Sequence, residues 1–235
     1  MAHRVKIGVD GCGILTRETI LPHLSQPDFT CQAEVVAVAD IVPERARLAS
    51  EEHGIPSHFS SLEEMLEQAE LDAVLIIVPH ALHAQHALKC LKAGRHAYVQ
   101  KPFAPSLAEG QAVINEAKSR GLKVVAAPGQ VLWPLYQEIK KIIADGEIGV
   151  PYFAVPPMLG WGGEEVGFPS DPSWFFAQDA GPLRDHGGYG IATLTTLFGP
   201  VQRVAAMMST PVPFRTWQGT KFDVGCADNT AVLLE

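Results

Sequence analysis

The chain has 235 residues, 47% of them hydrophobic and 19% charged, with a formal net charge of -8. That length is enough for one large or two modest domains with a buried core. The 18 Lys and Arg residues against 26 Asp and Glu, with no basic block, argue against nucleic acid as a partner. No apolar run approaches the roughly 18 residues of a membrane helix, and the N-terminal apolar stretch is too short for a signal peptide.

The four cysteines are scattered through the chain, and no two of them form a CxxC pair. Scattered thiols fit a reducing compartment better than an oxidising one. We therefore expect a cytoplasmic protein with no membrane partner. The cysteines are Cys12, Cys31, Cys90 and Cys226.

A strand predicted over Val5 to Val9 leads into a turn with two glycines, and a helical pattern of apolar residues follows. Strand, glycine turn and helix together are typical of dinucleotide-binding folds. There, the glycines let the backbone approach a pyrophosphate at the helix N-terminus. The residues expected to contact the cofactor at this turn are Gly11, Gly13, Ile14 and Leu15.

Two residues depart from the usual glycine pattern. Thr16 occupies the third glycine position, where it fits if the helix packs slightly farther from the sheet. Asp10 places a carboxylate directly before the turn, where it would repel a pyrophosphate unless it is turned away and hydrogen-bonded. The sequence offers no explanation for Asp10.

The second predicted strand, Ala33 to Asp40, ends in an acidic residue. Asp40 has the spacing at which a dinucleotide fold places a carboxylate for the adenosine ribose. This position favours NAD over NADP, because a 2'-phosphate would meet a like charge. Alternatively, Asp40 caps the helix predicted over Pro43 to His53, and the two roles are compatible.

Strands and helices alternate through the rest of the first half. In the segment Asp72 to Val78, every residue after Asp72 is apolar, as a central parallel strand buried on both faces requires. The alternation predicts a doubly wound parallel sheet of the Rossmann type over residues 1–128. The other expected elements are helices Ser61 to Ala69, Ala84 to Lys92 and Leu107 to Arg120, and strands Ala97 to Val99 and Lys123 to Ala127.

His80, His83 and His86 follow one another at three-residue spacing. A catalytic zinc site needs three protein ligands that converge on one point, and no cysteine or carboxylate lies nearby at ligand spacing. We therefore expect no metal site.

Lys101 follows a short predicted strand and precedes a bend fixed by Pro102. Open α/β sheets bind their ligands at the exits of strands, which makes Lys101 a candidate functional residue. The alternative is a solvated surface lysine that happens to precede a proline, since lysine is mostly exposed.

Several of these segments together resemble the Gfo/Idh/MocA family of NAD(P)-dependent oxidoreductases, which includes inositol dehydrogenase and glucose-fructose oxidoreductase. Gln100 stands where the family's Glu-Lys-Pro signature has glutamate. The resemblance implies that Pro79, His80, His83, Gln100 and Lys101 contact the cofactor. The matching segments are Gly11-Cys12-Gly13, Val38-Ala39-Asp40, Pro79-His80-Ala81-Leu82-His83, Ala93-Gly94-Arg95-His96 and Gln100-Lys101-Pro102.

For residues 129–235 the resemblance implies an α/β domain with a largely antiparallel open sheet, through which such proteins form homodimers or homotetramers. A helix is expected over Tyr136 to Ala144 and a first strand over Tyr152 to Val155. Later strands are expected over Gln202 to Met208 and at 231–235. Because the chain ends on an apolar strand, and the family's second domain usually continues, we expect this domain to be incomplete.

The segment Trp161 to Phe176 is too rich in glycine and proline for regular structure. Its aromatic residues suit a flap that stacks on the apolar face of a sugar, with Trp161 and Trp174 as substrate contacts. The alternative is a loop held on the domain surface by its own aromatic residues.

A helix is expected to begin at Pro182, and on it Asp185 and Tyr189 would share one face. Three glycines at 187, 188 and 190 cost about 1 kcal/mol each in a helix, which suggests that nicotinamide or substrate lies close against it. The Asp-x-x-x-Tyr spacing resembles glucose-fructose oxidoreductase-like members. That resemblance implies Tyr189 as acid/base and Asp185 as a substrate-orienting group, and we add Arg184 and His186 as substrate contacts.

Together these features predict an oxidoreductase that moves a hydride between NAD(H) and a secondary alcohol or carbonyl of a sugar, polyol or related small molecule. Lys101 would stabilise the developing alkoxide and assist proton transfer. One alternative is an NAD-dependent enzyme that cleaves a glycosidic bond through transient oxidation. Another is a non-catalytic dinucleotide-binding or assembly protein, suggested by the departures at Asp10, Thr16 and Gln100.

Overall fold

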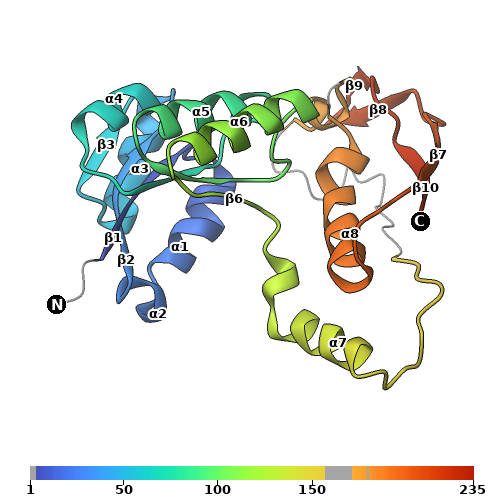
Figure 1. Ribbon diagram of the computed structural model, residues 1–235. Helices are drawn as coiled ribbons and strands as arrows, with labels where there is room; N and C mark the ends of the chain where they lie inside the picture. The colour runs from blue at the N-terminus through green and yellow to red at the C-terminus, as the bar shows by residue number, and fades with distance from the viewer. Residues whose placement is uncertain (1–3, 157–170, 179) are drawn as a thin grey trace. The chain divides into compact units, whose positions relative to one another are not determined.

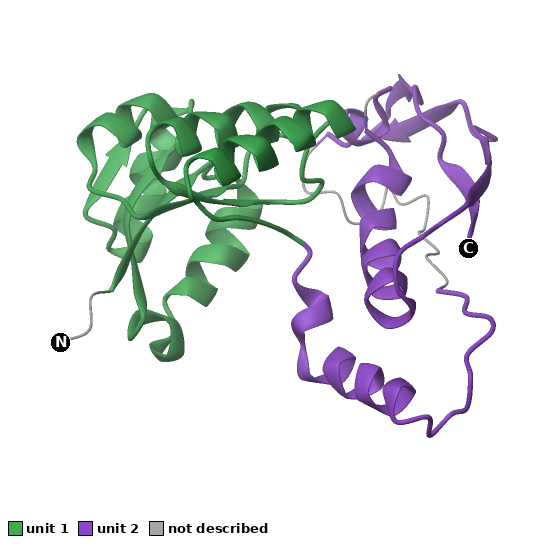
Figure 2. Ribbon diagram, viewed as in Figure 1, with its two compact units in different colours: residues 1–127 green, residues 128–235 purple. Residues whose placement is uncertain are grey.

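A computed structural model describes residues 4–156, 171–178 and 180–235 of the chain. The chain divides into two compact units, residues 1–127 and 128–235 (Figure 2). The division lies one residue before the boundary expected from the sequence.

Unit 1 contains one six-stranded sheet in the order β3-β2-β1-β4-β5-β6, and all its strand pairs are parallel (Figure 1). This order reverses between β1 and β4, as in a doubly wound Rossmann sheet, which confirms the predicted fold class. The strands are β1 (Val5–Asp10), β2 (Ala33–Ala39), β3 (Ser57–Phe59), β4 (Ala73–Ile76), β5 (His96–Val99) and β6 (Val124–Ala126).

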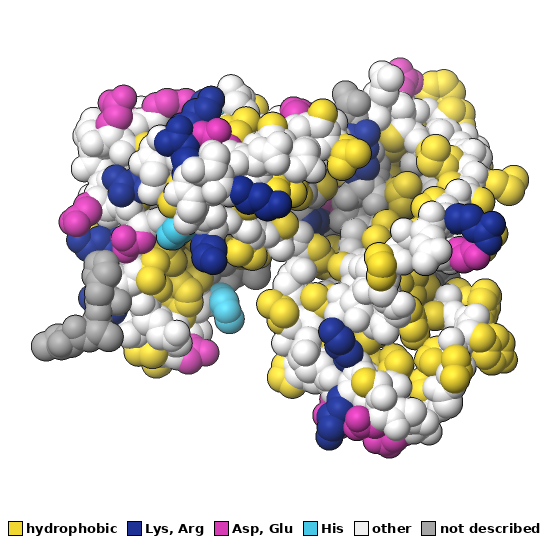
Figure 3. Space-filling model, in the orientation of Figure 1, with side chains coloured by type: hydrophobic (Ala, Val, Ile, Leu, Met, Phe, Trp, Pro, Cys, Tyr) yellow, Lys and Arg dark blue, Asp and Glu magenta, His cyan; other side chains and the backbone are white. Residues whose placement is uncertain are grey.

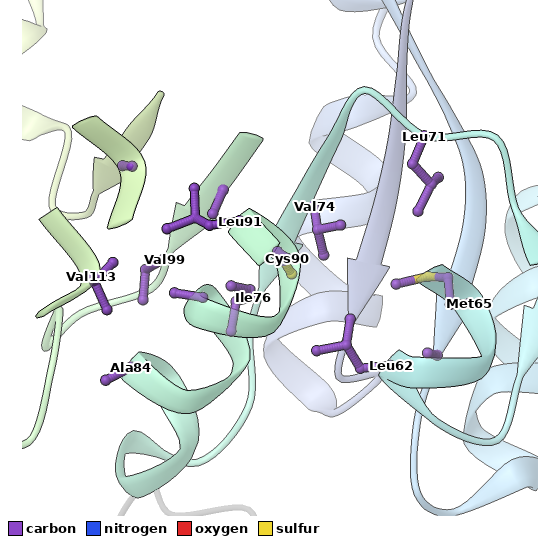
Figure 4. Close-up of a cluster of buried hydrophobic side chains, with 14 of the residues drawn as sticks. Leu62, Met65, Leu71, Val74, Ile76, Ala84, Cys90, Leu91, Val99 and Val113 are labelled. Atoms are coloured by element: carbon purple, nitrogen blue, oxygen red, sulfur yellow. The ribbon is translucent and has the colours of Figure 1, made fainter. Parts of the chain in front are cut away.

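Helices cover both faces of the sheet and bury two hydrophobic clusters. Leu62 and Met65 of one helix and Leu91 of a later one belong to the same buried cluster as the strand residues Val74 and Ile76 (Figure 4). The other cluster lies between the opposite face and the helical residues that follow β1 and β2. The helical elements are η1 (Thr16–Ile20, a π-helix), α1 (Leu21–Leu24), α2 (Pro27–Thr30), α3 (Pro43–His53), α4 (Leu62–Gln68), η2 (His80–Leu82), α5 (His83–Lys92) and α6 (Leu107–Ser119).

One row of paired residues crosses the whole sheet near the carboxyl ends of its strands. Its members, in sheet order, are Phe59, Ala39, Asp10, Ile76, Val99 and Ala126. The backbone ladder continues one residue further, because Gly11 N donates to Ala39 O and Gln100 N donates to Ile76 O. The segments that follow β1, β2, β4 and β5 therefore leave the sheet at one common level.

In its described residues, unit 2 has two long helices, two short 3-10 helices and two small antiparallel sheets. The β10-β7 pair and the β8-β9 pair confirm the antiparallel character expected for this part of the chain. The elements are η3 (Gln130–Leu132), α7 (Pro134–Ala144), η4 (Ser173–Phe176), α8 (Pro182–Phe198), β7 (Val204–Ser209), β8 (Phe214–Trp217), β9 (Thr220–Asp223) and β10 (Asn229–Leu234).

The strand expected over Tyr152 to Val155 is wrong. Residues 151–156 have no regular structure, and Tyr152 is 96% exposed. No strand among the described residues pairs with this segment, and an apolar run without a partner strand cannot form a ladder.

The sequence reading also missed the β8-β9 hairpin. Its two-residue turn, Gln218 and Gly219, has positive φ at both positions, 48° and 79°. A pair of positive φ values is typical of the tight hairpin turns whose twist matches the flanking strands.

The surface carries charges of both signs and many apolar side chains. In Figure 3 cationic and anionic side chains lie side by side over the helices of unit 1, and apolar side chains are frequent over unit 2. Within the described residues, no helix combines the length and the apolar character needed to cross a membrane.

Gly11 has a φ of 96°, and a Cβ built on it would lie 2.2 Å from the carbonyl oxygen of Ile77. We expect Gly11→Ala to lower the free energy of unfolding by at least about 3 kcal/mol, because backbone strain and a backbone clash act together. The control is Gly54→Ala, since Gly54 also has positive φ but an added Cβ meets nothing within 4 Å. That change should cost only about 1 kcal/mol in urea unfolding. Equal losses for the two variants would contradict the packing argument.

Candidate active site

The glycine turn after β1 is held by hydrogen bonds to its own residues and to β2. Thr16, which is fully buried, donates from Oγ1 to Gly11 O at 2.6 Å, and Gly11 N donates to Ala39 O at 2.8 Å. Thr16 therefore replaces the expected glycine with a side chain that closes the turn. An added Cβ on Gly13 meets nothing within 4 Å, and Ile14 and Leu15 are exposed, so this side of the turn is open to a ligand.

The carboxylate of Asp40 connects the end of β2 to the glycine turn. Its Oδ2 accepts from Cys12 N and its Oδ1 accepts from Val42 N, both at 2.8 Å. The helix α3 begins at Pro43, and its N-cap residue Val42 has no side-chain cap. Asp40 thus bonds the residue before the helix and does not cap the first turn itself, which corrects the capping alternative.

Cys12 lies in the turn as a buried thiol. Burial raises the pKa of Cys12 to about 12, and the nearby Asp40 and Asp10 carboxylates act in the same direction. At neutral pH the thiol is therefore protonated and adds no negative charge where a pyrophosphate would bind.

Asp10, unexplained from the sequence, pairs with a histidine of α5. His86 Nδ1 lies 2.6 Å from Asp10 Oδ2, and the two side chains are 13% and 5% exposed. Burial raises the pKa of Asp10, and the hydrogen bond and charge of His86 oppose that rise. The carboxylate is therefore turned toward α5 and partly neutralised there, as a neighbouring pyrophosphate requires.

His83 is fully buried at the first residue of α5. Its Nδ1 lies 2.6 Å from Pro102 O and its Nε2 lies 2.9 Å from Val78 O. Both ring nitrogens face protein carbonyls and no part of the ring is exposed. The ring thus faces protein atoms on both sides in this structure, and the expected cofactor contact of His83 stays a prediction from the family resemblance.

Lys101 lies two residues beyond β5, next to a glutamine that fixes its backbone. Gln100 N donates to Ile76 O at 3.0 Å, and Gln100 Oε1 accepts from Lys101 N at 2.8 Å. The peptide bond from Lys101 to Pro102 is cis. Lys101 is half-buried, so the alternative of a fully solvated lysine does not describe it.

The helix α8 of unit 2 begins with Pro182 in its first turn, as predicted, and carries Asp185 and Tyr189 one turn apart. Asp185 is buried, and its Oδ2 lies 3.0 Å from Nδ1 of the exposed His186. Gln130 donates from Nε2 to Tyr189 O at 3.0 Å and so connects η3 to this turn of α8. Arg184 is exposed beside them on the same helix.

The aromatic residues before α8 divide into an exposed and a buried group. Phe175 and Phe176 are buried, and the Arg215 guanidinium lies 4.7 Å from the Phe176 ring. Trp174 is 52% exposed. Phe175 and Phe176 therefore fit the alternative in which the loop is held on the domain by its own aromatic residues. Trp161 lies outside the described residues.

Unit 1 brings most of the predicted cofactor residues to one edge of its sheet. The glycine turn, Asp40, Pro79 and Gln100 all follow strands that end in the same row, and the row includes the switch point between β1 and β4. His80 lies in η2, directly after Pro79. With Gly13, Ile14 and Leu15 open and the Asp10 carboxylate turned toward His86, the residues of this edge fit a dinucleotide.

In the part of the chain that the structure describes, no group of three or more His, Cys, Asp or Glu side chains is placed to hold a metal ion. Thr16 and His86 were missed as site residues. A threonine hydroxyl can bond a nearby carbonyl, so the sequence alone could have suggested the role of Thr16. The pairing of His86 with Asp10 could not be predicted in this way, because the two residues are 76 positions apart in the chain.

Two family models match the chain. Residues 5–128 match the oxidoreductase family with an NAD-binding Rossmann fold, GFO_IDH_MocA, and residues 136–235 match the GFO/IDH/MocA C-terminal domain.

Curated relatives are dehydrogenases and reductases. A dTDP-3,4-didehydro-2,6-dideoxy-alpha-D-glucose 3-reductase of Streptomyces violaceoruber is 29% identical over 205 residues, covering 85% of this chain and 56% of the relative. A trans-1,2-dihydrobenzene-1,2-diol dehydrogenase of Sus scrofa is 25% identical over 232 residues, covering 97% of this chain and 63% of the relative. The chain thus spans little more than half the length of these relatives.

Among solved structures, levoglucosan dehydrogenase in complex with NADH and levoglucosan superposes with a TM-score of 0.83. It is 24% identical, and the match covers 99% of this chain and 63% of the other. At this identity the likeness establishes the fold.

We expect His86→Leu to lower the free energy of unfolding by about 3 kcal/mol or more, because it leaves the Asp10 carboxylate buried without its partner. Adding Asp10→Asn to that variant should recover part of the loss, since the buried charge is then gone. The control is Lys89→Met on the same helix, which breaks an ion pair with Glu63 whose side chains are 34% and 55% exposed. That change should cost no more than about 1 kcal/mol in urea unfolding. If Asp10→Asn deepens the loss, the charge argument is wrong.

Proposed function

The chain belongs to the Gfo/Idh/MocA family of oxidoreductases, and we propose that it transfers a hydride between NAD(H) and a secondary alcohol or carbonyl of a sugar, polyol or related small molecule. The observation that carries the proposal is the common edge of the unit 1 sheet. There, the open glycine turn, Asp40 and the Lys101 segment follow strands of one paired row. A cofactor site and a cationic side chain at the same edge of the sheet suit a reaction in which an alkoxide develops.

Bound NAD would supply the hydride acceptor or donor. In this proposal the glycine turn and the N-terminus of the helix after it bind the pyrophosphate, and Asp40 binds the adenosine ribose. Lys101 stabilises negative charge on the substrate oxygen and assists its proton transfer. Tyr189 of α8 is the proposed acid/base, and Asp185 of the same helix is proposed to orient substrate hydroxyls.

The proposed substrate contacts are polar and aromatic side chains of unit 2. Arg184 and His186 are exposed on α8, and Trp174 offers an exposed aromatic face to a sugar ring. Trp161 stays a proposed contact from the sequence alone.

The direct experiment is a panel of sugars and polyols incubated with the full-length protein and NAD+ or NADP+, followed at the nicotinamide absorbance. Substrate-dependent NADH formation supports the proposal. Glycosidic cleavage without net NADH would assign the protein to transient oxidation instead. NADH binding without turnover of any substrate would favour a non-catalytic dinucleotide-binding role.

We expect NAD to bind at least about tenfold more tightly than NADP, a difference of about 1.4 kcal/mol, because Asp40 opposes a 2'-phosphate. Asp40→Asn should narrow that ratio, since the amide oxygen still accepts from Cys12 N while the charge is removed. Asp72→Asn is the matched control, because Asp72 also accepts a hydrogen bond from a backbone N-H group, that of Lys6. Asp72 directly precedes β4 and lies away from the proposed site. Equal affinities of the unchanged protein for NAD and NADP in calorimetric titration would refute the role of Asp40.

Lys101→Met retains most of the packing of the side-chain stem and removes its charge. We expect NADH affinity to change little while kcat falls by about 10² to 10⁴, the loss typical of a positioned acid/base group. Tyr189→Phe should cause a similar loss and flatten one limb of the pH profile of kcat/KM. Lys118→Met, an exposed lysine of α6, is the control and should leave kcat unchanged. Near-normal turnover of the Lys101 variant would mean that this lysine has no part in the chemistry.

A further inference from the structure

The imidazole of His83 is a buried polar group that the proposed chemistry does not use. The two atoms that it contacts are Pro102 O and Val78 O, at 2.6 and 2.9 Å. Val78 lies just beyond β4 and Pro102 just beyond β5, and these two strands are neighbours in the sheet. A single side chain thus spans two adjacent strand exits.

The contact with Pro102 fixes the residue that directly follows Lys101. Proline has no backbone N-H, so its carbonyl is the only backbone group through which Pro102 forms a hydrogen bond. On the other side of Lys101, Gln100 is bonded to Ile76 O. After Pro102, Phe103 and Ala104 pack against the hydrophobic cluster between the sheet and α4, α5 and α6. Lys101 is therefore held between two anchored residues, and His83 provides one of the anchors.

We propose that His83 is a positioning residue for Lys101: its Nδ1-H donates to Pro102 O and so sets where the lysine side chain leaves the sheet edge. The inference rests on the proposed role of Lys101 in hydride transfer. Positioning of this kind matters because a misplacement of about 1 Å reduces an enzymatic rate by about 10²-fold.

The contact of a ring nitrogen with a carbonyl is a hydrogen bond only if that nitrogen carries a hydrogen. Both partners are carbonyl oxygens, so each ring nitrogen serves its partner only while it carries a hydrogen. Burial lowers the pKa of His83, and the two carbonyls and the Asp10 charge oppose that shift. The shorter contact, 2.6 Å between Nδ1 and Pro102 O, is the hydrogen bond that the proposal uses, because Nδ1 carries a hydrogen both in the charged ring and in the Nδ1-H form of the neutral ring.

Three substitutions separate this hydrogen bond from simple packing. The amide nitrogen of asparagine lies as many bonds from Cα as Nδ1 of histidine, and that of glutamine as many as Nε2. His83→Asn therefore retains a donor toward Pro102, His83→Gln moves it toward Val78, and His83→Leu has none. If His83 only fills space, the smaller asparagine should be the worst replacement, because it leaves the largest cavity.

We expect kcat to fall by about 10²-fold in His83→Leu and His83→Gln and by much less in His83→Asn, with NADH affinity nearly unchanged in all three. The opposite order, with His83→Asn the least active, would overturn the proposal. The control is Ser50→Ala, which removes the buried 2.7 Å hydrogen bond from Ser50 Oγ to Ile55 O in another part of the unit. It should lower stability and leave kcat unchanged.

Hydrogen exchange of residues 100–104 provides a readout that does not depend on activity. Exchange there should accelerate in His83→Leu and His83→Gln, stay close to the unchanged protein in His83→Asn, and be unaffected in Ser50→Ala. If exchange follows this pattern but the unchanged protein turns over no substrate, the proposed function fails while the anchoring of the Lys101 segment stands. If exchange in this segment is the same in all four variants, His83 does not position it.

Discussion

The parallel register of the unit 1 sheet is the constraint on which the candidate site depends. Asp10, Ala39, Ile76 and Val99 are paired across neighbouring strands, so the residue after each of them leaves the sheet at the same level. Segments far apart in the chain thereby deliver a glycine turn, a carboxylate and a lysine to one edge. A slip of one residue in any of these strands would turn its side chains to the other face of the sheet and move its exit away from the others.

Just beyond this row of paired residues, buried polar side chains form hydrogen bonds with backbone groups of the segments that leave the sheet. Thr16 bonds the carbonyl of Gly11, Asp40 accepts from two backbone N-H groups, and His83 contacts two carbonyls. Such groups are costly to bury unless they are satisfied, which makes their partners specific. The residues left accessible at the same edge, Ile14 and Leu15 among them, are the ones available to a ligand. Thr16 and His83 thus position the backbone, whereas Asp40 combines that task with its proposed contact to the ribose.

Much of the fold could be read from local sequence, because the buried parallel strands are apolar runs and the helices between them are periodic. The helix α3 has the predicted bounds, Pro43–His53, and α6 differs by one residue at its end. Contacts between residues that are distant in the sequence could not be predicted from local patterns. The segment Tyr152 to Val155 has the composition of a strand but no partner strand among the described residues. The contacts of His83 are made to carbonyls that only the folded chain brings to its ring. Asp10 was unexplained for the same reason, since its partner is contributed by α5.

The conformation of the glycine turn is imposed by the protein itself. The atom that excludes a side chain at Gly11 is the carbonyl oxygen of Ile77 in the neighbouring strand segment, and the hydroxyl that closes the turn belongs to Thr16. Folding of the sheet therefore already restricts this loop to its bent form. The loss of conformational entropy needed to shape it belongs to folding and does not weaken ligand binding. A dinucleotide would therefore bind to a loop that already has its bound shape. Its association rate would be limited by encounter and desolvation, and not by closure of the loop.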